Sequence, residues 1–410
     1  MGQTDEEAFL AGEGVRMKKA LVLGGKLQGV EAAYLMKKAG WQVILMDKEK
    51  EVPAFELADR FVQADLCDEA GLEQQMREAD LVIPALEKLA VLEVIAKAAE
   101  RCGAKLMFRL SSYRISSSKR QSDRLFARLG VPAPKPWPDC SFPVIVKPSG
   151  RSGSEGVCLC DGPESLSALA KANGGRDHLI IQEYLTGPSY SIEIIAEHGQ
   201  LKTFQVTELE MDEVYDCKRV LCPSGLDDVQ EAVFADCAAD LARAVDLEGI
   251  MDVEVILHDG KLKVLEIDAR IPSQTLTAVY ASTGAAAPAI YAAGAAGDLL
   301  EYTRYPARGV LYEHILVQDK CLKICGEHIM GDRGRLHYRT DFFGADEALT
   351  SYEGPGQSSW VATLLILGRD REACWRKHQQ IVRRIMEAEG LKDYEDKGPS
   401  VQRRKENERL

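Results

Sequence analysis

Acidic residues end two neighbouring apolar segments and could hold a divalent metal ion. Glu266 and Asp268 end a mostly apolar run, and because side chains alternate along a strand, their carboxylates share one face. Glu254 lies in a second apolar run, before the hairpin signal at 258–261. Carboxylates gathered this closely repel one another unless a cation neutralises them, and Arg270 follows directly. The segment therefore predicts a site for a divalent metal and phosphate.

The register of this hairpin decides whether the acids converge. A two-residue turn at 259–260 would place Glu254 opposite Leu265 and turn its carboxylate away from Glu266. A three-residue loop, or a one-residue bulge at Gly260, would pair Glu254 with Glu266. A metal site therefore predicts the bulged turn. The alternative is a solvated hairpin with one charged face.

A lysine followed by a glycine-rich loop could bind phosphate. Lys147 ends the apolar segment 144–146, and the loop 149–156 after it is rich in glycine and serine. A lysine at the end of a buried strand needs an anion, and the N–H groups of such a loop can surround phosphate oxygens. The loop lacks the Walker pattern, which excludes P-loop chemistry. The alternative is an ordinary lysine at the start of a hairpin, beside a flexible loop.

A glycine turn near the N-terminus supports a second nucleotide hypothesis. Residues 24–29 read GGKLQG, between a predicted strand at 20–24 and a predicted helix at 28–39. Asp47 ends the next strand, where a dinucleotide fold binds ribose. The glycines depart from the G-x-G-x-x-G pattern, so this turn gives only weak support to the hypothesis of an NAD-dependent dehydrogenase. A turn that only packs helix against strand is the other alternative.

The composition is that of an ordinary soluble protein. Apolar residues make up 46% and charged residues 28% of the chain, which is ordinary for a soluble protein. Its length of 410 residues is enough for two or three domains. The net charge of −13 argues against nucleic-acid and anionic-membrane partners, because both attract basic surfaces. The uncharged run 271–297 is rich in alanine and glycine and includes Pro288, so we expect no membrane span. Eleven scattered cysteines indicate reduced thiols in a cytoplasmic protein.

The pattern of predicted elements divides the chain into three folded parts. Strands alternate with helices over 17–110, which predicts a Rossmann-like α/β domain with a parallel sheet. Strands and turns dominate 111–305, which predicts an α+β domain, and a small C-terminal domain is expected at 306–392. The acidic, polar segment 1–16 does not resemble a signal peptide and predicts a disordered extension. Residues 393–410 predict a charged tail.

Taken in order, these pieces resemble the ATP-grasp superfamily of carboxylate–amine ligases. Over residues 18–388 the shorter motifs resemble those of its pyrrolysine-biosynthesis members. These motifs are GGKLQG at 24–29, YRIS at 113–116, YDC at 215–217, GIMDVE at 249–254, IDAR at 267–270, PSQT at 272–275, YEH at 312–314 and GRDRE at 368–372. The resemblance implies an ATP-grasp architecture with an N-terminal Rossmann-like domain, a central ATP-grasp domain and a small C-terminal domain.

The resemblance also implies an activity. It implies that ATP and Mg²⁺ drive the joining of (3R)-3-methyl-D-ornithine to the ε-amine of L-lysine, through an acyl phosphate. Both substrates are small molecules, and the resemblance leaves a homodimer open. The alternatives are another ATP-grasp ligase for amino acids or purine precursors, a nucleotide-binding regulator without catalysis, and the dehydrogenase.

Functional residues follow from the same resemblance. The metal ligands are Glu254, Glu266 and Asp268, and catalytic roles fall to Arg270 and Lys147. Nucleotide contacts are expected at Lys26, Asp47, Lys119, Lys147, Ser152, Gly153, Gln182, Glu183, Tyr184 and Leu185. Lysine would bind at Leu27, Gln28 and Glu87, and the ornithine-type substrate at Ser191, Glu193, Asp252, Arg270 and Ser273.

The chain departs from the pattern of the family in two places, and two of the assigned acids have a simpler explanation. Residues 187–189 lack the acid that many ATP-grasp enzymes use for ribose. Leu276 stands where the motif would have proline. For Glu87 and Glu193 the alternative is a surface salt bridge.

Overall fold

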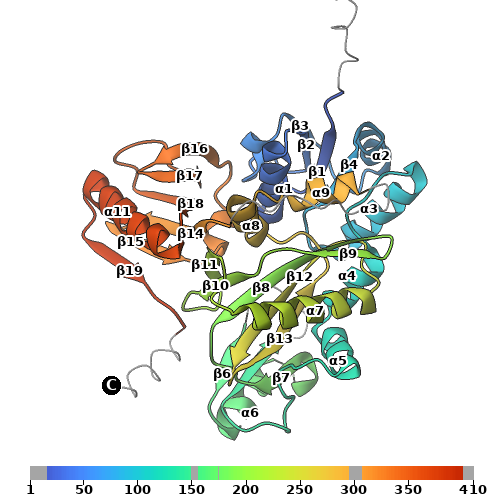
Figure 1. Ribbon diagram of the computed structural model, residues 1–410, viewed down its shortest axis with the longest axis vertical. Coiled ribbons are helices and arrows are strands. Elements are labelled where there is room, and N and C mark those ends of the chain that lie inside the picture. Colours follow the sequence, from blue (N-terminus) through green and yellow to red (C-terminus); the bar gives the residue numbers. More distant parts are fainter. Residues whose placement is uncertain (1–15, 149–155, 174, 295–306, 400–410) are drawn as a thin grey trace, which may run out of the picture.

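The structure is a computed structural model that describes residues 16–148, 156–173, 175–294 and 307–399. Its strands form three sheets, with helices packed against them (Figure 1). Ser152 and Gly153, two of the predicted nucleotide contacts, lie outside the described residues. So does the predicted N-terminal extension, apart from residue 16.

The N-terminal sheet has four strands in the order β3-β2-β1-β4. All its strand pairs are parallel, which confirms the predicted parallel sheet. The strands are β1 (Lys19–Leu23), β2 (Gln42–Asp47), β3 (Arg60–Gln63) and β4 (Leu81–Pro84). The helices between and after them are α1 (Leu27–Lys38), the 3₁₀ turn η2 (Phe55–Leu57), α2 (Glu69–Glu78) and α3 (Leu89–Cys102).

A small antiparallel sheet in the order β6-β5-β7 carries the predicted phosphate-binding lysine. Its strands are β5 (Val144–Pro148), β6 (Cys158–Cys160) and β7 (Leu179–Glu183). The neighbouring helices are α4 (Leu110–Ser116), α5 (Lys119–Leu129), α6 (Pro163–Ala172) and the 3₁₀ turn η3 (Arg176–His178).

The third sheet, of twelve strands, runs from the acidic hairpin to the C-terminal part of the chain. Its main path is β13-β12-β8-β10-β11-β14-β18-β17-β16, with β9 beside β8 and β15 between β14 and β19. The strands are β8 (Ser189–Glu197), β9 (Gln200–Thr203), β10 (Thr207–Met211), β11 (Cys217–Cys222), β12 (Gly249–His258), β13 (Lys261–Asp268), β14 (Gly309–Gln318), β15 (Cys321–Cys325), β16 (His337–Phe342), β17 (Ala345–Thr350), β18 (Ser359–Gly368) and β19 (Asp393–Asp396). The pairing of β11 with β14 therefore joins the predicted central and C-terminal parts in one sheet.

Two helices of this half of the chain lie within the uncharged run 271–297. The helices of this half are α7 (Asp228–Ala244), α8 (Thr275–Thr283), α9 (Ala287–Ala293), α10 (His328–Gly331) and α11 (Arg371–Glu389). α8 packs against α1 and against the large sheet, and Leu276, at the expected proline position, is fully buried in that core. No helix of the described part of the chain is long and apolar enough to cross a membrane.

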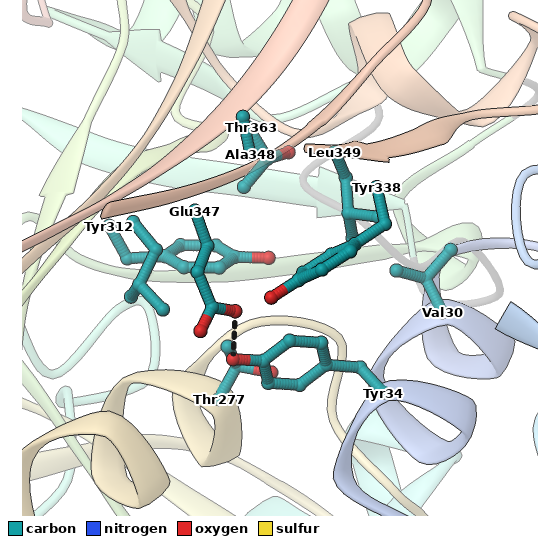
Figure 2. Close-up of a pocket in the computed structure, with 10 residues that line it drawn as sticks. Val30, Tyr34, Thr277, Tyr312, Tyr338, Glu347, Ala348, Leu349 and Thr363 are labelled. Atoms are coloured by element: carbon teal, nitrogen blue, oxygen red, sulfur yellow. Dashed lines mark hydrogen bonds between the residues drawn. The ribbon is translucent and has the colours of Figure 1, made fainter. Parts of the chain in front are cut away.

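A second contact joins the N-terminal part to the end of the large sheet (Figure 2). Tyr34 and Lys38 of α1 donate hydrogen bonds of 2.7 Å each to the two carboxylate oxygens of Glu347 in β17. The cavity beside this contact has a volume of only about 20 Å³. It can hold little more than a water molecule, so we regard it as part of the interface between these elements.

A buried arginine ties the last described strand to the large sheet. Arg219 of β11 is 1% exposed, and its Nε and Nη2 donate to Glu313 Oε2 at 3.0 Å and Asp396 Oδ2 at 2.9 Å. Glu210 of β10 accepts a third hydrogen bond, and Lys218 also donates to Asp396. Strands β10, β11, β14 and β19 thus meet at one cation. β19 lies within the segment for which we predicted a charged tail.

Two glycines at equivalent helix positions have different surroundings. Gly29 is the third residue of α1, and a Cβ there would lie 2.2 Å from the Gly24 carbonyl oxygen. Gly71 is the third residue of α2, and its Cβ would lie 2.7 Å from the movable carboxylate of Asp68. The backbone approach at Gly29 therefore tolerates no side chain, whereas the contact at Gly71 can adjust.

We predict that Gly29→Ala lowers the free energy of unfolding by about 2 kcal/mol or more, because the turn at Gly24 must move. Alanine is the better helix former by about 1 kcal/mol, so the steric cost must exceed that gain. The control Gly71→Ala should stay within about 1 kcal/mol of the wild type. Urea unfolding of the wild type and the two variants checks this. Equal losses of unfolding free energy in both variants would show that the position in the helix, and not the neighbouring atoms, determines the effect.

Candidate active site

The acidic hairpin adopts the register that gathers its carboxylates. Glu254 lies opposite Glu266, and Asp252 lies opposite Asp268. The predicted pairing is confirmed, but the predicted bulge at Gly260 is wrong. The turn is the two-residue 259–260 turn with positive φ at both positions, and the register shifts farther along, where Leu265 is the extra residue. The Asp-Gly turn keeps its preferred form, and the bulge at Leu265 restores the convergence of the acids.

The paired acids line one cavity of about 150 Å³ together with Arg270. The cavity acids on this hairpin are Asp252, Glu254, Glu266 and Asp268. Burial raises the pKa of Glu254 to about 7 and that of Asp268 to about 6, and it raises the pKa of Asp252 well above its ordinary value. Arg270 Nη2 lies 2.8 Å from Asp268 Oδ2, but one guanidinium cannot neutralise four carboxylates.

The acids fit a divalent cation. Asp268 Oδ1 is buried and has no hydrogen-bond partner among the described residues, although Arg270 pairs with the other oxygen of that carboxylate. Carboxylate oxygens from Glu254, Glu266 and Asp268 are the hard ligands that Mg²⁺ prefers. A cation held there would oppose the raised pKa values, since it stabilises the ionised form of each acid.

A neighbouring cavity, of about 130 Å³, shares Glu254 and Glu266 with the acidic one. Four residues of the 182–185 segment line it: Gln182, Glu183, Tyr184 and Leu185. Its apolar lining includes the side chains of Ile145, Val157 and Ile256. We call this cavity the slot; it extends to Glu254 and Glu266, two of the predicted metal ligands.

Two lysines lie near Glu266. Lys147 lines the slot, and burial lowers the pKa of its ammonium group. Lys119, the first residue of α5, holds its Nζ 3.4 Å from Glu266 Oε1. Both lysines border a third small cavity with Gln182 and Glu266. The structure therefore brings together the predicted phosphate-binding lysines and the predicted metal ligands.

The other predicted nucleotide contacts are placed differently. Glu183 Oε2 accepts hydrogen bonds from Lys263 Nζ at 2.7 Å and Lys135 N at 3.1 Å, so its side chain is engaged within the protein. Lys26 Nζ lies 3.8 Å from Asp332 Oδ1, and Asp47 Oδ2 accepts the Gly25 N–H at 2.8 Å. Neither Lys26 nor Asp47 lines the slot or the acidic cavity, and their nucleotide roles stay predictions.

The residues predicted to bind lysine meet Arg270. Glu87 Oε1 accepts hydrogen bonds from Arg270 Nη2 at 2.7 Å and from Gln28 Nε2 at 3.0 Å. The Tyr113 hydroxyl donates to the Glu87 backbone oxygen at 2.8 Å, and Leu27 precedes Gln28 at the start of α1. Glu87 is therefore tied to the hairpin arginine and does not form an isolated surface salt bridge.

Four of the five residues predicted for the ornithine-type substrate line the acidic cavity, and Glu193 does not. Ser191, Asp252, Arg270 and Ser273 line it. Glu193 is 0% exposed, and its Oε1 accepts the Ser191 hydroxyl at 3.0 Å. This burial contradicts the surface salt-bridge alternative for Glu193, and it raises the pKa of that carboxyl to about 7.

Sequence reasoning missed several cavity residues. Tyr215, Asp216 and Cys217 lie between β10 and β11 or at the start of β11, and Glu327 precedes α10. The YDC motif carried the resemblance but suggested no role. Glu327 has no local signal, because only the continuation of the sheet through β14 and β15 brings it to the cavity.

The three sheets and the two cavities that meet at paired acids define a protein of the ATP-grasp class. A model of the ATP-grasp domain family matches residues 116–274. A 3-methyl-D-ornithine–L-lysine ligase of Methanosarcina mazei is 34% identical over 364 residues, 88% of this chain and 93% of that protein. The Methanosarcina barkeri protein of the same name is 32% identical, over 87% of this chain and 94% of that protein. The chain belongs to the family of 3-methyl-D-ornithine–L-lysine ligases.

Solved structures show the same fold. The biotin carboxylase domain of Hydrogenobacter thermophilus 2-oxoglutarate carboxylase, solved with MgADP and bicarbonate, has a TM-score of 0.68 at 16% identity and covers 89% of each chain. An ADP complex of N5-carboxyaminoimidazole ribonucleotide synthetase also has a TM-score of 0.68 at 16% identity, over 91% of this chain and 98% of the other. Identities this low support the fold alone.

A further buried acid, in α1, makes the stability of the protein depend on pH. Glu31 of α1 is 1% exposed, and its carboxylate accepts the Thr277 N–H at 2.6 Å. Burial raises its pKa to about 8, and the carboxylates of Glu193 and Glu327 add to the shift. Because the folded pKa exceeds the unfolded one, the folded state binds more protons, and stability falls as pH rises between the two values.

We predict that the free energy of unfolding decreases from about pH 5 to about pH 8, and that Glu31→Gln makes this decrease smaller by up to a few kcal/mol, on the order of the linkage for one such group. The Thr277 hydroxyl contacts the other oxygen of the same carboxylate, and glutamine can keep both contacts with Thr277 without a charge. Urea unfolding at several pH values checks this. The control Glu100→Gln, an exposed residue of α3, should leave the slope unchanged. An unaltered slope in Glu31→Gln would contradict the assignment.

Proposed function

We propose that this protein is an ATP-dependent carbon–nitrogen ligase that joins the carboxylate of (3R)-3-methyl-D-ornithine to the ε-amine of L-lysine. The meeting of two cavities at Glu254 and Glu266 carries the proposal. One cavity is an apolar slot beside two lysines, suited to a nucleotide. The other is acidic and holds one arginine, suited to an amino acid that bears two ammonium groups. The product would be 3-methylornithyl-N6-lysine, an intermediate of pyrrolysine biosynthesis.

In this proposal ATP lies in the slot with its adenine against residues 182–185, whose backbone can pair with the ring edge. Ser189 also lines the slot, where the segment 187–189 supplies no acid for ribose. Lys147 and Lys119 neutralise phosphate oxygens, and the lowered pKa of Lys147 would recover beside an anion. Glu254, Glu266 and Asp268 would hold Mg²⁺, which, when bound, neutralises the phosphates and aligns them.

The chemistry then follows from position and charge. A carboxylate oxygen of the ornithine-type substrate attacks the γ-phosphorus, and ADP leaves, which yields an acyl phosphate. The lysine ε-amine attacks the acyl carbon, inorganic phosphate leaves, and the nitrogen loses its proton as the amide forms. Arg270, held between Asp268 and Glu87, stabilises the negative charge that develops at the acyl group.

In this arrangement Glu87 and Gln28 place the attacking ε-amine of the lysine substrate beside Arg270. All eleven cysteines are free thiols, which suits the cytoplasm, a reducing compartment, as the proposed location. No nucleic-acid or membrane partner is needed, because both proposed substrates are small molecules.

We predict that ADP forms at an appreciable rate only when Mg²⁺, 3-methyl-D-ornithine and L-lysine are all present. Glu266→Gln should reduce kcat at least about 100-fold, because a metal ligand loses its charge. Coupled ADP release and mass spectrometry of the amide product check this. Glu372→Gln, on the exposed surface of α11, serves as the control. No ligation by the wild type with any pair of amino acids would contradict the proposed function.

We also predict that Glu87→Gln raises KM for lysine about 10-fold to 100-fold, which corresponds to one charge-assisted hydrogen bond to an ammonium group. The KM for 3-methyl-D-ornithine should change far less. The glutamine amide oxygen can still accept from Arg270, so the local structure should persist. Steady-state kinetics with each substrate varied in turn check the assignment, and an equal rise in both KM values would contradict it.

A further inference from the structure

Glu327 lines the acidic cavity although it is far in sequence from the acids of the hairpin. It lies between β15 and α10, in the C-terminal part of the chain, and lines the cavity with Asp252 and Asp268. Its place there results from the pairing of β11 with β14 and of β14 with β15. The mechanism described above gives this residue no role.

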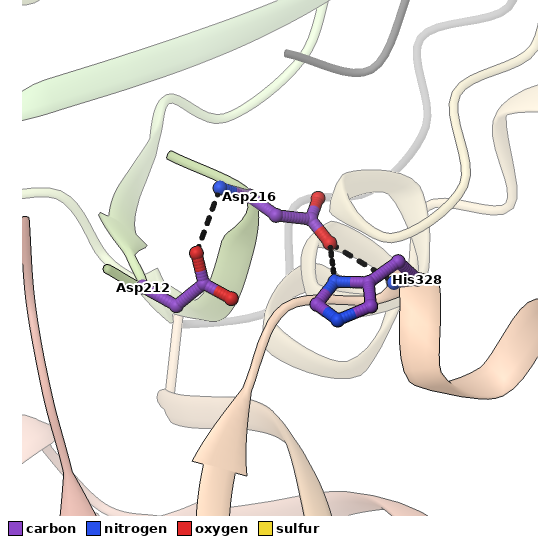
Figure 3. Close-up of side chains that lie close together, drawn as sticks. All are labelled: Asp212, Asp216 and His328. Atoms are coloured by element: carbon purple, nitrogen blue, oxygen red, sulfur yellow. Dashed lines mark hydrogen bonds and ion pairs between the residues drawn. The ribbon is translucent and has the colours of Figure 1, made fainter. Parts of the chain in front are cut away.

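A set of hydrogen bonds holds the segment around Glu327 against the turn between β10 and β11 (Figure 3). Gly326 N donates to Asp212 Oδ2, and His328 N donates to Asp216 Oδ2, both at 2.9 Å. The His328 ring also contacts Asp216. A Cβ at Gly326 would lie 2.2 Å from Asp216 Oδ2, so only glycine allows this approach.

Asp212, Asp216 and His328 have ligand atoms within 4.8 Å of one another, as a metal site would. Their atoms already have partners, however. Asp212 Oδ1 accepts the N–H groups of Val214 at 2.9 Å and Asp216 at 3.0 Å. We therefore interpret the three residues as a clamp that positions Glu327, and propose no metal ion there.

Besides Asp268 Oδ1, two further carboxylate oxygens at the cavity have no donor among the described residues. Glu327 Oε2 and Asp252 Oδ1 are both buried, and neither accepts a hydrogen bond within the described ranges of the chain. Asp252 as a whole is 8% exposed. Burial raises the pKa of Glu327 to about 7, even though hydrogen bonding with Ser273 opposes the shift. Buried acceptors without donors are costly, so a ligand that supplies N–H groups would relieve both.

We propose that Glu327 binds the side-chain ammonium group of the diamino-acid substrate. This inference rests on the proposed function. Asp252 lies opposite Asp268, a predicted metal ligand, and therefore belongs to the end of the cavity where the reacting carboxylate and its α-ammonium group lie. Glu327 is next to Asp216 and Ser273 instead, so it takes the ammonium group farther along the substrate.

The assignment makes Glu327 a determinant of specificity. An amino acid that lacks the distal ammonium group would leave Glu327 Oε2 buried without a donor, and sites of this kind reject such analogues strongly. The acid thus selects a diamino acid over an apolar amino acid of the same length. The clamp contributes by fixing the carboxylate at the distance that this substrate needs.

The test compares 3-methyl-D-ornithine with its analogue in which a methyl group replaces the distal ammonium group. For the wild type, kcat/KM should be at least about 100-fold lower with the analogue. Glu327→Gln should lower kcat/KM for the diamino acid about 10-fold to 100-fold, mainly through KM, and should barely affect the analogue. Glu327→Asp, which keeps the charge, should retain more of the discrimination. Asp332→Asn, an exposed change just after α10, is the matched control.

Calorimetric titration of the diamino acid into enzyme loaded with ADP and Mg²⁺ separates binding from catalysis. Weaker binding by Glu327→Gln, with an unchanged circular dichroism spectrum, supports the inference. Wild-type discrimination retained in Glu327→Gln overturns the inference and leaves the proposed function intact. If Glu327→Gln does not fold, the wild type alone decides: equal values of kcat/KM for the diamino acid and its analogue overturn the inference. A wild type that neither ligates nor binds the diamino acid overturns both proposals.

Discussion

Mutual repulsion among carboxylates gathered in one cavity is the constraint on which this structure depends. Two unit charges 4 Å apart interact by about 4 kcal/mol at the effective dielectric constant near a protein surface. Asp252, Glu254, Glu266 and Asp268 line one cavity, and their nearest cations are Arg270 and two lysines. The site is therefore electrostatically incomplete without ligands. Each cationic ligand, whether a metal ion or an ammonium group, removes repulsion as it binds.

Every part of the fold contributes side chains to this one hairpin. The N-terminal part supplies Gln28 of α1 and Glu87 after β4, the small sheet supplies Lys147, and the segment after β15 supplies Glu327. α8 follows the hairpin directly and packs against both α1 and the large sheet. One apolar core therefore joins the N-terminal part to the large sheet, which explains how groups from distant sequence positions meet around this hairpin.

The sequence allowed the local features to be predicted but not the long-range ones. Alternating strands and helices predicted the parallel sheet, and the need to gather acids predicted the pairing of Glu254 with Glu266. The position of the bulge was missed, since nothing local distinguishes Leu265 from its neighbours, whereas Gly260 is the residue a bulge usually favours. Glu327 was missed because its role depends on which strands lie side by side. Strand order in a sheet is a property of the whole chain.

The contacts of Arg219 bear on how the protein is made in the cell. Strands β10 and β11 flank the turn that lines the acidic cavity, yet the buried cation between them is balanced partly by Asp396 of β19. During synthesis the ribosome releases Asp396 long after the hairpin acids. Until then Arg219 lacks one of its counter-ions, and the wall formed by these strands cannot reach its final order. The wall of the cavity thus reaches its final order only after Asp396 has been synthesised.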